Sequence, residues 1–311
     1  MFGKALLLAV GLDLVLGDPQ WGGHPVRWVG RLAAALEPPC RRMSRLTPEV
    51  QGMVFLGGVL LGTLLPVGVL SLLLAFLPGG WIGHALLFYF ALGGTALARE
   101  VRAVSRALGA GDLAEAQQRL ALLTRRKGSA LNSRGIAREA LETLATAFGD
   151  AVCGTLLYGM LGGPVLAWLH RATNALNAAG GHSASPYGAF GKASHRFNDL
   201  LNLLPSRLGA LGVAVASKAS GGSFRQPLVT AWRDAPAWES PNEGWPMGAF
   251  AGALGISLGG PRAYGGVVAQ KPFLGRGPAP EPGDLDRGLE LYWRAFFVAT
   301  LGALALGGLG L

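Results

Sequence analysis

Apolar and polar residues follow one another along this chain in long blocks, and the longest block is apolar. From Val50 to Ala98 there are 49 consecutive residues without an Asp, Glu, Lys or Arg. Because a helix needs about 20 apolar residues to cross the hydrocarbon core of a membrane, this block predicts two spans, Met53–Leu77 and Trp81–Leu97. The sequence Pro78-Gly79-Gly80 between them is typical of a tight connection.

Three further apolar segments are long enough for membrane-associated helices. Met1–Leu16 opens the chain, Ala151–His170 is 20 residues long without a formal charge, and Ala295–Leu311 would form a helix of about 26 Å. The run Leu208–Ser217 is too short to cross independently, so we expect a re-entrant or deeply tilted arrangement around Ala151–Ser217. The pattern predicts an all-α, polytopic integral membrane protein with about four or five transmembrane or re-entrant helices.

The polar blocks differ from one another in composition. Arg99–Ala145 carries the alternating charges of water-exposed helices and predicts two of them, Ala98–Leu108 and Asp112–Thr124. Asp112 is the expected N-cap of the second, with Glu115 in the capping-box position. The later polar blocks are rich in Asn, Ser, Gly and Pro, which favours loops. We therefore expect one membrane-embedded domain over 1–311, a cytoplasmic helical segment over 99–145, and polar loops over 171–207 and 218–294 that line a functional site.

Composition and charge support the membrane assignment. Only 14% of the residues are charged and 49 of the 311 are glycine, whereas soluble domains have about 25% charged residues and about 7% glycine. These values exclude an ordinary soluble globule, a disordered chain and a secreted disulfide scaffold. The two cysteines, Cys40 and Cys153, are far apart in the sequence and are expected to be free thiols.

The basic excess indicates how the chain is oriented. The net charge of +9 comes from 27 Lys and Arg against 18 Asp and Glu, and in a membrane protein such an excess is typical of cytoplasmic loops. A nucleic acid partner is therefore not expected. Two crossings within the charge-free block place the basic stretches Pro38–Val50 and Arg99–Ala145 on one side, which we assign to the cytoplasm. We expect a multi-pass protein of the cell membrane.

The polar residues suggest binding of anions, although the common catalytic templates are absent. The sequence contains no His-Glu-x-x-His, no paired Cys-x-x-Cys, no Walker phosphate loop and no nucleophile elbow. The run Arg125-Arg126-Lys127 could hold phosphate oxygens, because arginine donates parallel hydrogen bonds; a solvated charge run is the alternative. His24 could be a ligand or an acid–base group, or a hydrogen-bonded loop residue.

Four polar residues flank the apolar run Ala151–His170 or follow it. Asp150, Arg171 and Asn174 lie at its two ends, where buried charges are costly and are often functional; interfacial anchors are the alternative. Asp199 could help to hold Mg²⁺, which usually takes one or two carboxylates together with substrate phosphates. A helix cap or a salt bridge with the nearby His195 would explain Asp199 equally well.

Several polar motifs occur in a fixed order from the first helix to the last loop, and any one of them is weak alone. Together they resemble the CbiB/CobD family of cobalamin biosynthesis proteins, the adenosylcobinamide-phosphate synthases. The motifs cover nearly the whole chain and include Gly17-Asp18-Pro19, His24-Pro25-Val26, Gly109-Ala110-Gly111-Asp112, Glu142 to Asp150, Leu161-Gly162-Gly163-Pro164, Arg171-Ala172-Thr173-Asn174, Asp199-Leu200-Leu201-Asn202, Pro205-Ser206-Arg207, Ser240 to Pro246, and Lys271-Pro272.

The resemblance implies a membrane enzyme that joins cobyric acid to aminopropanol, or to aminopropanol phosphate, through an amide bond. ATP would be the co-substrate and Mg²⁺ the metal, and membrane lipid would surround the protein. A neighbouring pathway enzyme or a second copy of the chain could be a partner. Carried over by motif, the catalytic residues are Asp150, Asp199 and Glu142, with Mg²⁺ on Asp150 and Asp199. The substrate- and phosphate-binding residues are Asp18, His24, Arg125, Arg171, Asn174, Arg207, Asn242, Trp245 and Lys271.

Some positions differ from the family pattern, and two other functions follow from the differences. Arg125-Arg126-Lys127 stands for Arg-Asp-Thr and Thr146-Ala147 for Glu-Asn, while Asn177, His182, Asn198 and Met247 stand for Asp, Tyr, Asp and Glu. One alternative is a catalytically weakened relative that binds a corrinoid. The other is a small transporter, which Gly- and Pro-interrupted spans would suit, although the sequence has no matching inverted halves.

Overall fold

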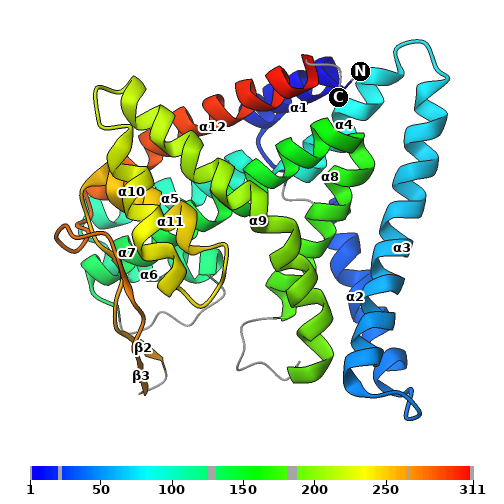
Figure 1. The fold of residues 1–311 in the computed structure, drawn as a ribbon, viewed down its shortest axis with the longest axis horizontal. Helices are drawn as coiled ribbons and strands as arrows, with labels where there is room; N and C mark the ends of the chain where they lie inside the picture. Colours follow the sequence, from blue (N-terminus) through cyan, green and yellow to red (C-terminus); the bar gives the residue numbers. More distant parts are fainter. Residues whose placement is uncertain (1, 20–22, 125–130, 181–187, 265–266, 309–311) are drawn as a thin grey trace. The chain divides into compact units, whose positions relative to one another are not determined.

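A computed structural model describes residues 2–19, 23–124, 131–180, 188–264 and 267–308 of the protein, and these residues are almost entirely helical (Figure 1). The predicted all-α class is confirmed. The chain divides into two compact units, each of which gathers segments that are distant in the sequence. The first unit comprises Met1–Gly93, Gly154–Asn202 and Gly302–Leu311, and the second comprises Gly94–Cys153 and Leu203–Leu301.

The first unit contains most of the apolar segments. Helix α1 (Gly3–Leu16) packs against α4 (Gly80–Leu92), and α2 (Pro25–Arg41) lies along α3 (Pro48–Ala75). Both α3 and α4 contact α8 (Gly154–Gly180) (Figure 1). The ring of Phe2 meets the rings of His84 and Phe88 edge-on at 5.6 and 6.1 Å, which closes one end of this packing. The unit also contains the first part of α9 (Gly188–Ala219).

The exposed apolar surface of helix α3 is the clearest sign of a lipid environment. It is 28 residues long, and only 11% of its most apolar window is buried within the protein. Large apolar side chains such as Leu61, Leu65 and Leu72 are more than half exposed. Since a continuous apolar surface of this kind is rare on soluble proteins, it fits a hydrocarbon surrounding.

The second unit has an aromatic core held by the C-terminal helix. The ring of Phe148 contacts those of Tyr292 and Phe250 edge-on at 5.7 and 6.2 Å, and all three side chains are fully buried. The helices of this unit are α5 (Gly94–Gly109), α6 (Leu113–Thr124), α7 (Ser133–Ala147), the π-helical turn η1 (Phe148–Cys153), the rest of α9, α10 (Arg225–Asp234), the 3₁₀ turn η2 (Ala235–Ala237), α11 (Gly244–Leu254) and most of α12 (Asp284–Gly308).

Four short strands lie between α11 and α12. Strands β1 (Leu258–Gly259) and β4 (Phe273–Leu274) pair antiparallel, with Leu258 opposite Leu274. Strands β2 (Arg262–Tyr264) and β3 (Val267–Ala269) form a second antiparallel pair, with Ala263 opposite Val268. Each strand is two or three residues long, so the pairs shape a loop rather than a sheet layer.

Five segments of the described residues are long and apolar enough to cross a membrane, which identifies a multi-pass membrane protein. The predicted span Met53–Leu77 and the first apolar helix are confirmed. The predicted span Trp81–Leu97 lies within the candidate span Gly80–Gly109, but it is divided at Gly93, where α4 has ended and α5 begins with the next residue. The predicted helix after Asp112 is confirmed as well, because the Glu115 N–H donates to Asp112 Oδ1 at 2.9 Å. The segments are Pro48–Ala75, Gly80–Gly109, Ser133–Ala178, Gly188–Ala219 and Asp284–Gly307.

The prediction of loops over 171–207 and 218–294 is wrong for most of these residues. Helix α8 continues to Gly180, and α9 begins at Gly188 and runs for 32 residues. Leu208–Ser217, judged too short to cross alone, is the end of α9. Helices α10, α11 and the start of α12 occupy much of 218–294. The physical reason is tertiary: polar and small residues of weak helix propensity become helical when packing satisfies one of their faces.

Helix α8 bends where the sequence contains Gly162-Gly163-Pro164. Gly162 and Gly163 leave the helical conformation, and Gly163 has φ of 66°, a left-handed value that favours glycine. A Cβ on Gly163 would also lie 2.5 Å from the Phe2 ring, so a side chain there would have to displace this ring. The re-entrant arrangement that we expect around this region stays a prediction.

Candidate functional site

The motif Gly17-Asp18-Pro19 is placed by the end of α1 and by α4. Gly17 ends α1 with φ of 69°, and its N–H caps the helix by donating to Asp13 O. The Tyr89 hydroxyl of α4 donates to Gly17 O. These contacts fix the backbone immediately before Asp18.

His24 faces Asp18 because it caps the next helix. Its Nδ1 accepts the N–H of Val26 at 3.3 Å, and Pro25 occupies the first turn of α2, where a missing N–H costs nothing. The other ring nitrogen, Nε2, lies 2.8 Å from Asp18 Oδ1, with side-chain exposures of 6% and 18%. Among the described residues Nε2 has no hydrogen-bond partner, so the contact with Asp18 is electrostatic.

Arg171 of α8 converges on the same carboxylate. A Cβ built on Gly93 would lie 3.2 Å from Arg171 Nη2 and 3.9 Å from Asp18 Oδ2, so both groups reach this glycine. Arg171 interacts electrostatically with Asp18 and with Asp13, which is fully buried on α1. Its Nε is buried and has no hydrogen-bond partner among the described residues. We call Asp13, Asp18, His24 and Arg171 the charge cluster.

A neutral amide network lies next to Arg171 in the sequence. His170 Nε2 lies 2.9 Å from Asn202 Oδ1, and the Asn202 amide donates to Asn174 Oδ1 at 3.0 Å and to Asn198 Oδ1 at 3.2 Å. The Tyr158 ring stacks on His170 at 5.3 Å. Asn198, where the family resemblance suggests Asp, is 3% exposed. An amide suits this place, because an unpaired carboxylate would be costly to desolvate.

His170 and Asn202 were not among the predicted site residues. The signal for them was the spacing of four between His170 and Asn174 and between Asn198 and Asn202, which puts each pair on one helix face. Asp199, which was predicted, points its carboxylate to His195 Nε2 at 3.4 Å, and His195 Nδ1 contacts Asn177 Oδ1 at 3.0 Å. The salt bridge considered for Asp199 is therefore present.

The second unit carries an aromatic and cationic surface that we call the platform, made of Arg207, Trp232 and Trp245. The Arg207 guanidinium lies 4.5 Å from the centre of the Trp245 ring, and Trp232 meets Trp245 edge-on at 5.6 Å. Trp232 is 74% exposed. Arginine over tryptophan is a favourable cation–π contact, so the platform offers apolar faces that remain open.

The Ser240 to Pro246 motif forms the turn that leads into α11 and contains Trp245 of the platform. Ser240 Oγ accepts the N–H groups of Asn242 and Glu243, both at 3.3 Å, just before α11 begins. Asn242 is 2% exposed and lies inside this turn. The Trp238 indole donates to Glu243 Oε2 at 3.1 Å, and Lys271 pairs with Glu239. The motif is therefore a tightly bonded turn that presents Trp245 at the start of α11.

Glu142 and Asp150 occupy two successive elements. Glu142 Oε1 accepts the N–H of Gly259 at 2.7 Å, so this buried carboxylate fixes strand β1 against α7. Asp150 lies in the π-helical turn η1 that ends the α7 segment. Turns of this kind are rare and are frequent at functional sites, and nothing in the local sequence indicated one.

Asp234 anchors α10 to strand β4. Its two oxygens accept hydrogen bonds from Arg233 at 2.6 Å each, and the N–H of Gly275 donates to Oδ2 at 2.8 Å. Burial opposes ionisation, but the Arg233 and Gly275 hydrogen bonds and the charges of Arg233 and Arg276 outweigh it, so the pKa of Asp234 lies below its usual 3.8. The ionised form therefore stabilises the fold.

Replacing Asp234 by asparagine is expected to lower the free energy of unfolding at neutral pH by about 1–3 kcal/mol, since hydrogen bonds to charged groups are lost. Because the folded-state pKa is depressed, this contribution is complete above the unfolded-state pKa and disappears as the pH falls through the folded-state value. Thermal unfolding in detergent across the acidic range measures the difference. Glu281→Gln, which breaks the exposed pair with Arg134, is the control and should change little. An unchanged difference in acid would contradict the assignment.

The structure separates the predicted site residues into two groups. Asp18, His24, Arg171, Asn174 and Asp199 belong to the first unit, and Glu142, Asp150, Arg207, Asn242, Trp245 and Lys271 to the second. Arg125 lies outside the described residues, as do Arg126, Lys127 and His182. Asp18, His24 and Arg171 are brought together, and Arg207 is brought to Trp245.

The described residues fit only a magnesium site in which substrate phosphates supply part of the ligands. No group of three or more His, Cys, Asp or Glu in the described part of the chain could hold a metal ion. Mg²⁺ needs only one or two carboxylates when substrate phosphates and water complete its shell. Asp150 and Asp199 lie in different units, so a site that they share stays a prediction.

Comparisons with known proteins agree over nearly the whole length of the chain. The family model described as CobD/Cbib protein matches residues 6–292. The cobalamin biosynthesis protein CobD of Rhodobacter capsulatus is 39% identical over 310 residues, covering 96% of both chains. CobD of Klebsiella pneumoniae is 37% identical, covering 95% of this chain and 93% of its own.

A third relative extends the match to the other family name. The cobalamin biosynthesis protein CbiB of Salmonella typhi is 36% identical over 312 residues, covering 97% of this chain and 95% of its own. No solved structure matches this chain. The family model spans most of the chain, and these relatives cover it almost end to end, so the protein belongs to the CobD/CbiB family.

Proposed function

We propose that this protein acts late in cobalamin biosynthesis, in the cell membrane, and joins cobyric acid to aminopropanol or aminopropanol phosphate through an amide bond. The relatives are named cobalamin biosynthesis proteins. The observation that carries the proposal is the charge cluster, in which Asp18 lies 2.8 Å from His24 and converges with Arg171 at Gly93. Two neighbouring motifs and a third that is distant in the sequence thus meet around one carboxylate.

The cluster suits the amine partner of an amide-forming reaction. A carboxylate that is 18% exposed can bind an ammonium group and accept its proton. Once Asp18 has taken that proton, the amine nitrogen bonds to the carboxyl carbon as the bond from this carbon to the activated oxygen breaks, and a second nitrogen proton leaves with the departing phosphate. His24 holds Asp18 Oδ1, and Arg171 balances the charge of Asp13 and Asp18, so the acceptor is positioned before the amine arrives.

ATP with Mg²⁺ would supply the activation of the cobyric acid carboxyl group. Asp150 and Asp199 are the carboxylates proposed to hold the metal, and Arg125 with Arg171 is proposed to bind phosphate oxygens. The π-helical turn supports Asp150, since such turns are frequent at functional sites. Glu142 has a positional role through Gly259, and its proposed part in catalysis acts through that strand.

Asp150→Asn and Asp199→Asn are each expected to lower the turnover number by about tenfold or more, because a carboxylate ligand contributes charge that an amide lacks. The Mg²⁺ concentration for half-maximal rate should rise, while protein yield and the unfolding midpoint stay near wild type. Asp112→Asn, which alters only an exposed cap, is the matched control. Unchanged turnover and Mg²⁺ dependence in both variants would remove these residues from the site.

The platform suits the corrinoid partner, which combines a wide apolar ring with amide side chains. Trp245 and the 74% exposed Trp232 offer apolar ring faces, and Arg207 adds donors beside them. Lys271, paired with Glu239, and the buried Asn242 are proposed to complete the polar edge. Aromatic faces of this kind contribute a large apolar area for a small loss of entropy.

Trp245→Ala is expected to raise the KM for cobyric acid by about tenfold, because it removes an apolar contact worth about 1–3 kcal/mol. The turnover number should change much less, since the platform binds substrate and does not touch the reacting atoms. Steady-state kinetics separate the two parameters. Trp81→Ala, at an exposed tryptophan of the first unit, is the control and should leave both unchanged. A fall in turnover without a change in KM would contradict the role.

The direct test uses the full-length protein in detergent with cobyric acid, ATP, Mg²⁺ and either amine. Mass spectrometry should detect the amide product, and comparison of the two amines identifies the preferred one. Corrinoid binding without product would overturn the proposal in favour of a corrinoid-binding relative. Accumulation of a corrinoid inside proteoliposomes without chemistry would overturn it in favour of a transporter.

A further inference from the structure

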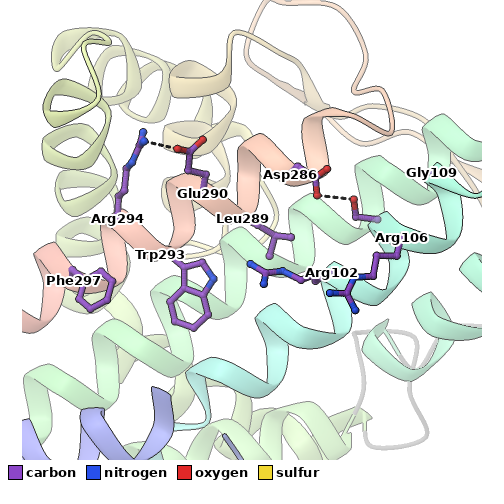
Figure 2. A pocket seen from close by; sticks show the side chains of 10 residues that line it. Arg102, Arg106, Gly109, Asp286, Leu289, Glu290, Trp293, Arg294 and Phe297 are labelled. Atoms are coloured by element: carbon purple, nitrogen blue, oxygen red, sulfur yellow. Dashed lines mark hydrogen bonds and ion pairs between the residues drawn. The ribbon is translucent and has the colours of Figure 1, made fainter. Parts of the chain in front are cut away.

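A pocket of about 640 Å³ lies between α5 and α12 in the second unit (Figure 2). The Ser105 hydroxyl of α5 donates to Asp286 Oδ1 of α12 at 2.8 Å, and the Tyr292 hydroxyl donates to Gly94 O at 2.8 Å. Rising residue numbers in α5 thus meet falling numbers in α12, so the helices are antiparallel. The pocket is not part of the charge cluster or the platform.

The pocket lies where both helices change from polar to apolar. Helix α5 ends a candidate span whose last charge-free residue is Ala98, and α12 begins a span without charge after Arg294. Because the helices are antiparallel, their polar ends coincide. Trp293, which lines the pocket, stands at this boundary, as tryptophan does at the interface of membrane and water.

One side of the pocket is cationic. Arg102 and Arg106 are four residues apart, are exposed, and point into the same space (Figure 2). Neither has an ion-pair or hydrogen-bond partner among the described residues, whereas the two lining carboxylates are engaged, Asp286 by Ser105 and Glu290 by Arg294. Two neighbouring guanidinium groups match the unesterified oxygens of a phosphate group.

Helix α12 contributes a row of apolar side chains to the pocket, next to its charged lining residues Asp286, Glu290 and Arg294. Leu289, Trp293 and Phe297 follow one another at intervals of four along one face of α12. Phe297 is 48% exposed, and it lies within the uncharged part of the span. An elongated apolar chain could therefore run from the guanidinium groups along this face toward the membrane interior.

We propose that this pocket binds the headgroup of an anionic glycerophospholipid, with its phosphodiester on Arg102 and Arg106 and an acyl chain along Leu289, Trp293 and Phe297. Basic pockets between membrane helices bind lipid headgroups in this way. Asp286 beside the arginines disfavours a polyanion such as a nucleotide, while a diester with a single charge is tolerated. The proposal concerns a site separate from the proposed amide-forming chemistry.

Quenching of Trp293 by brominated acyl chains tests the proposal in the full-length protein. Nanodiscs of phosphatidylcholine receive either brominated phosphatidylglycerol or brominated phosphatidylcholine, and the difference between wild type and Trp293→Phe isolates the signal of this tryptophan. Trp293 should be quenched at about tenfold lower content of the anionic lipid, as expected for charge-assisted hydrogen bonds. Equal quenching of Trp293 by the two lipids would overturn the proposal, and this result does not depend on how the arginine variants behave.

Arginine variants locate the effect. Arg102→Gln/Arg106→Gln should abolish the preference for phosphatidylglycerol, and Arg102→Lys/Arg106→Lys should retain part of it. The matched control is Arg42→Gln/Arg45→Gln, which removes two exposed charges next to another candidate span. An equal loss in the control would indicate general surface attraction, and relief of quenching by inorganic phosphate would assign the pocket to a soluble phosphate; either result overturns the proposal.

Discussion

Replacing Arg171 by methionine is expected to lower the free energy of unfolding by about 3–5 kcal/mol, the range for removing one partner of a buried charge pair. The guanidinium interacts with both Asp18 and the fully buried Asp13, so the variant leaves the Asp13 carboxylate in a place from which it cannot reach water. The measurement is the unfolding midpoint of the purified protein in detergent. Arg196→Met, at an exposed arginine of the same unit, is the control and should shift stability by less than about 0.5 kcal/mol.

A charge-neutral combination separates lost charge balance from lost packing. Arg171→Met together with Asp13→Asn and Asp18→Asn should recover much of the stability, because no uncompensated charge then remains. The triple variant should still be inactive, since Asp18 is the proposed proton acceptor. If the triple variant is as unstable as Arg171→Met alone, Arg171 stabilises the helices by packing and not by balancing Asp13 and Asp18.

Replacing Asp18 by asparagine is expected to reduce the turnover number of amide formation by about 10²- to 10⁴-fold, the usual contribution of a general base. Asparagine keeps the size of the side chain and can still contact His24, so the local structure should persist. The rate is measured with saturating cobyric acid, amine and ATP, and the unfolding midpoint is recorded for the same sample. A loss of rate that parallels a loss of folded protein would refute a catalytic role.

His24 provides the matched comparison for Asp18. Because His24 touches Asp18 and caps α2 through Val26, it is a positioning residue rather than the acceptor. His24→Asn can still accept the N–H near the helix start, so the fold should survive while turnover falls less than in Asp18→Asn. The pH dependence of the rate should keep its shape in His24→Asn. A larger effect from His24 than from Asp18 would reverse the two roles.

The membrane spans could be predicted from the sequence because hydrophobicity is local. The charge-free block from Val50 to Ala98 needed only its length to predict two spans; α4 lies within it, and α3 begins two residues before it. The motifs also allowed the family to be identified, since the order of short sequence patterns can be read without knowing the geometry. The polar helices were harder, because 171–207 and 218–294 have weak propensity, and packing decided their conformation.

For the site, too, the residue types could be predicted from the sequence, but the contacts between distant residues could not. Asp18, His24 and Arg171 were candidates by residue type and motif, yet more than 140 positions separate Asp18 from Arg171, and no periodicity links them. The structure joined them through Gly93, which is close to both side chains. The π-helical turn at Asp150 depends on backbone geometry, and nothing in the local sequence indicates it. The spacing of four places the amide side chains of α8 and α9 on helix faces, but only the packing of the two helices joins them in a network around Asn202.

By itself, the sequence determined that this is an all-α, multi-pass membrane protein of the CobD/CbiB family, because span length, charge bias and motif order are properties of consecutive residues. Only the tertiary structure decided which polar residues meet. It placed two arginines of α5 that have no ion-pair partner among the described residues beside apolar side chains of α12, and it brought the carboxylate of Asp18 to His24 and, at Gly93, to Arg171. The physical reason is that burial makes charges seek partners across helices, and the identity of those partners depends on how the helices pack.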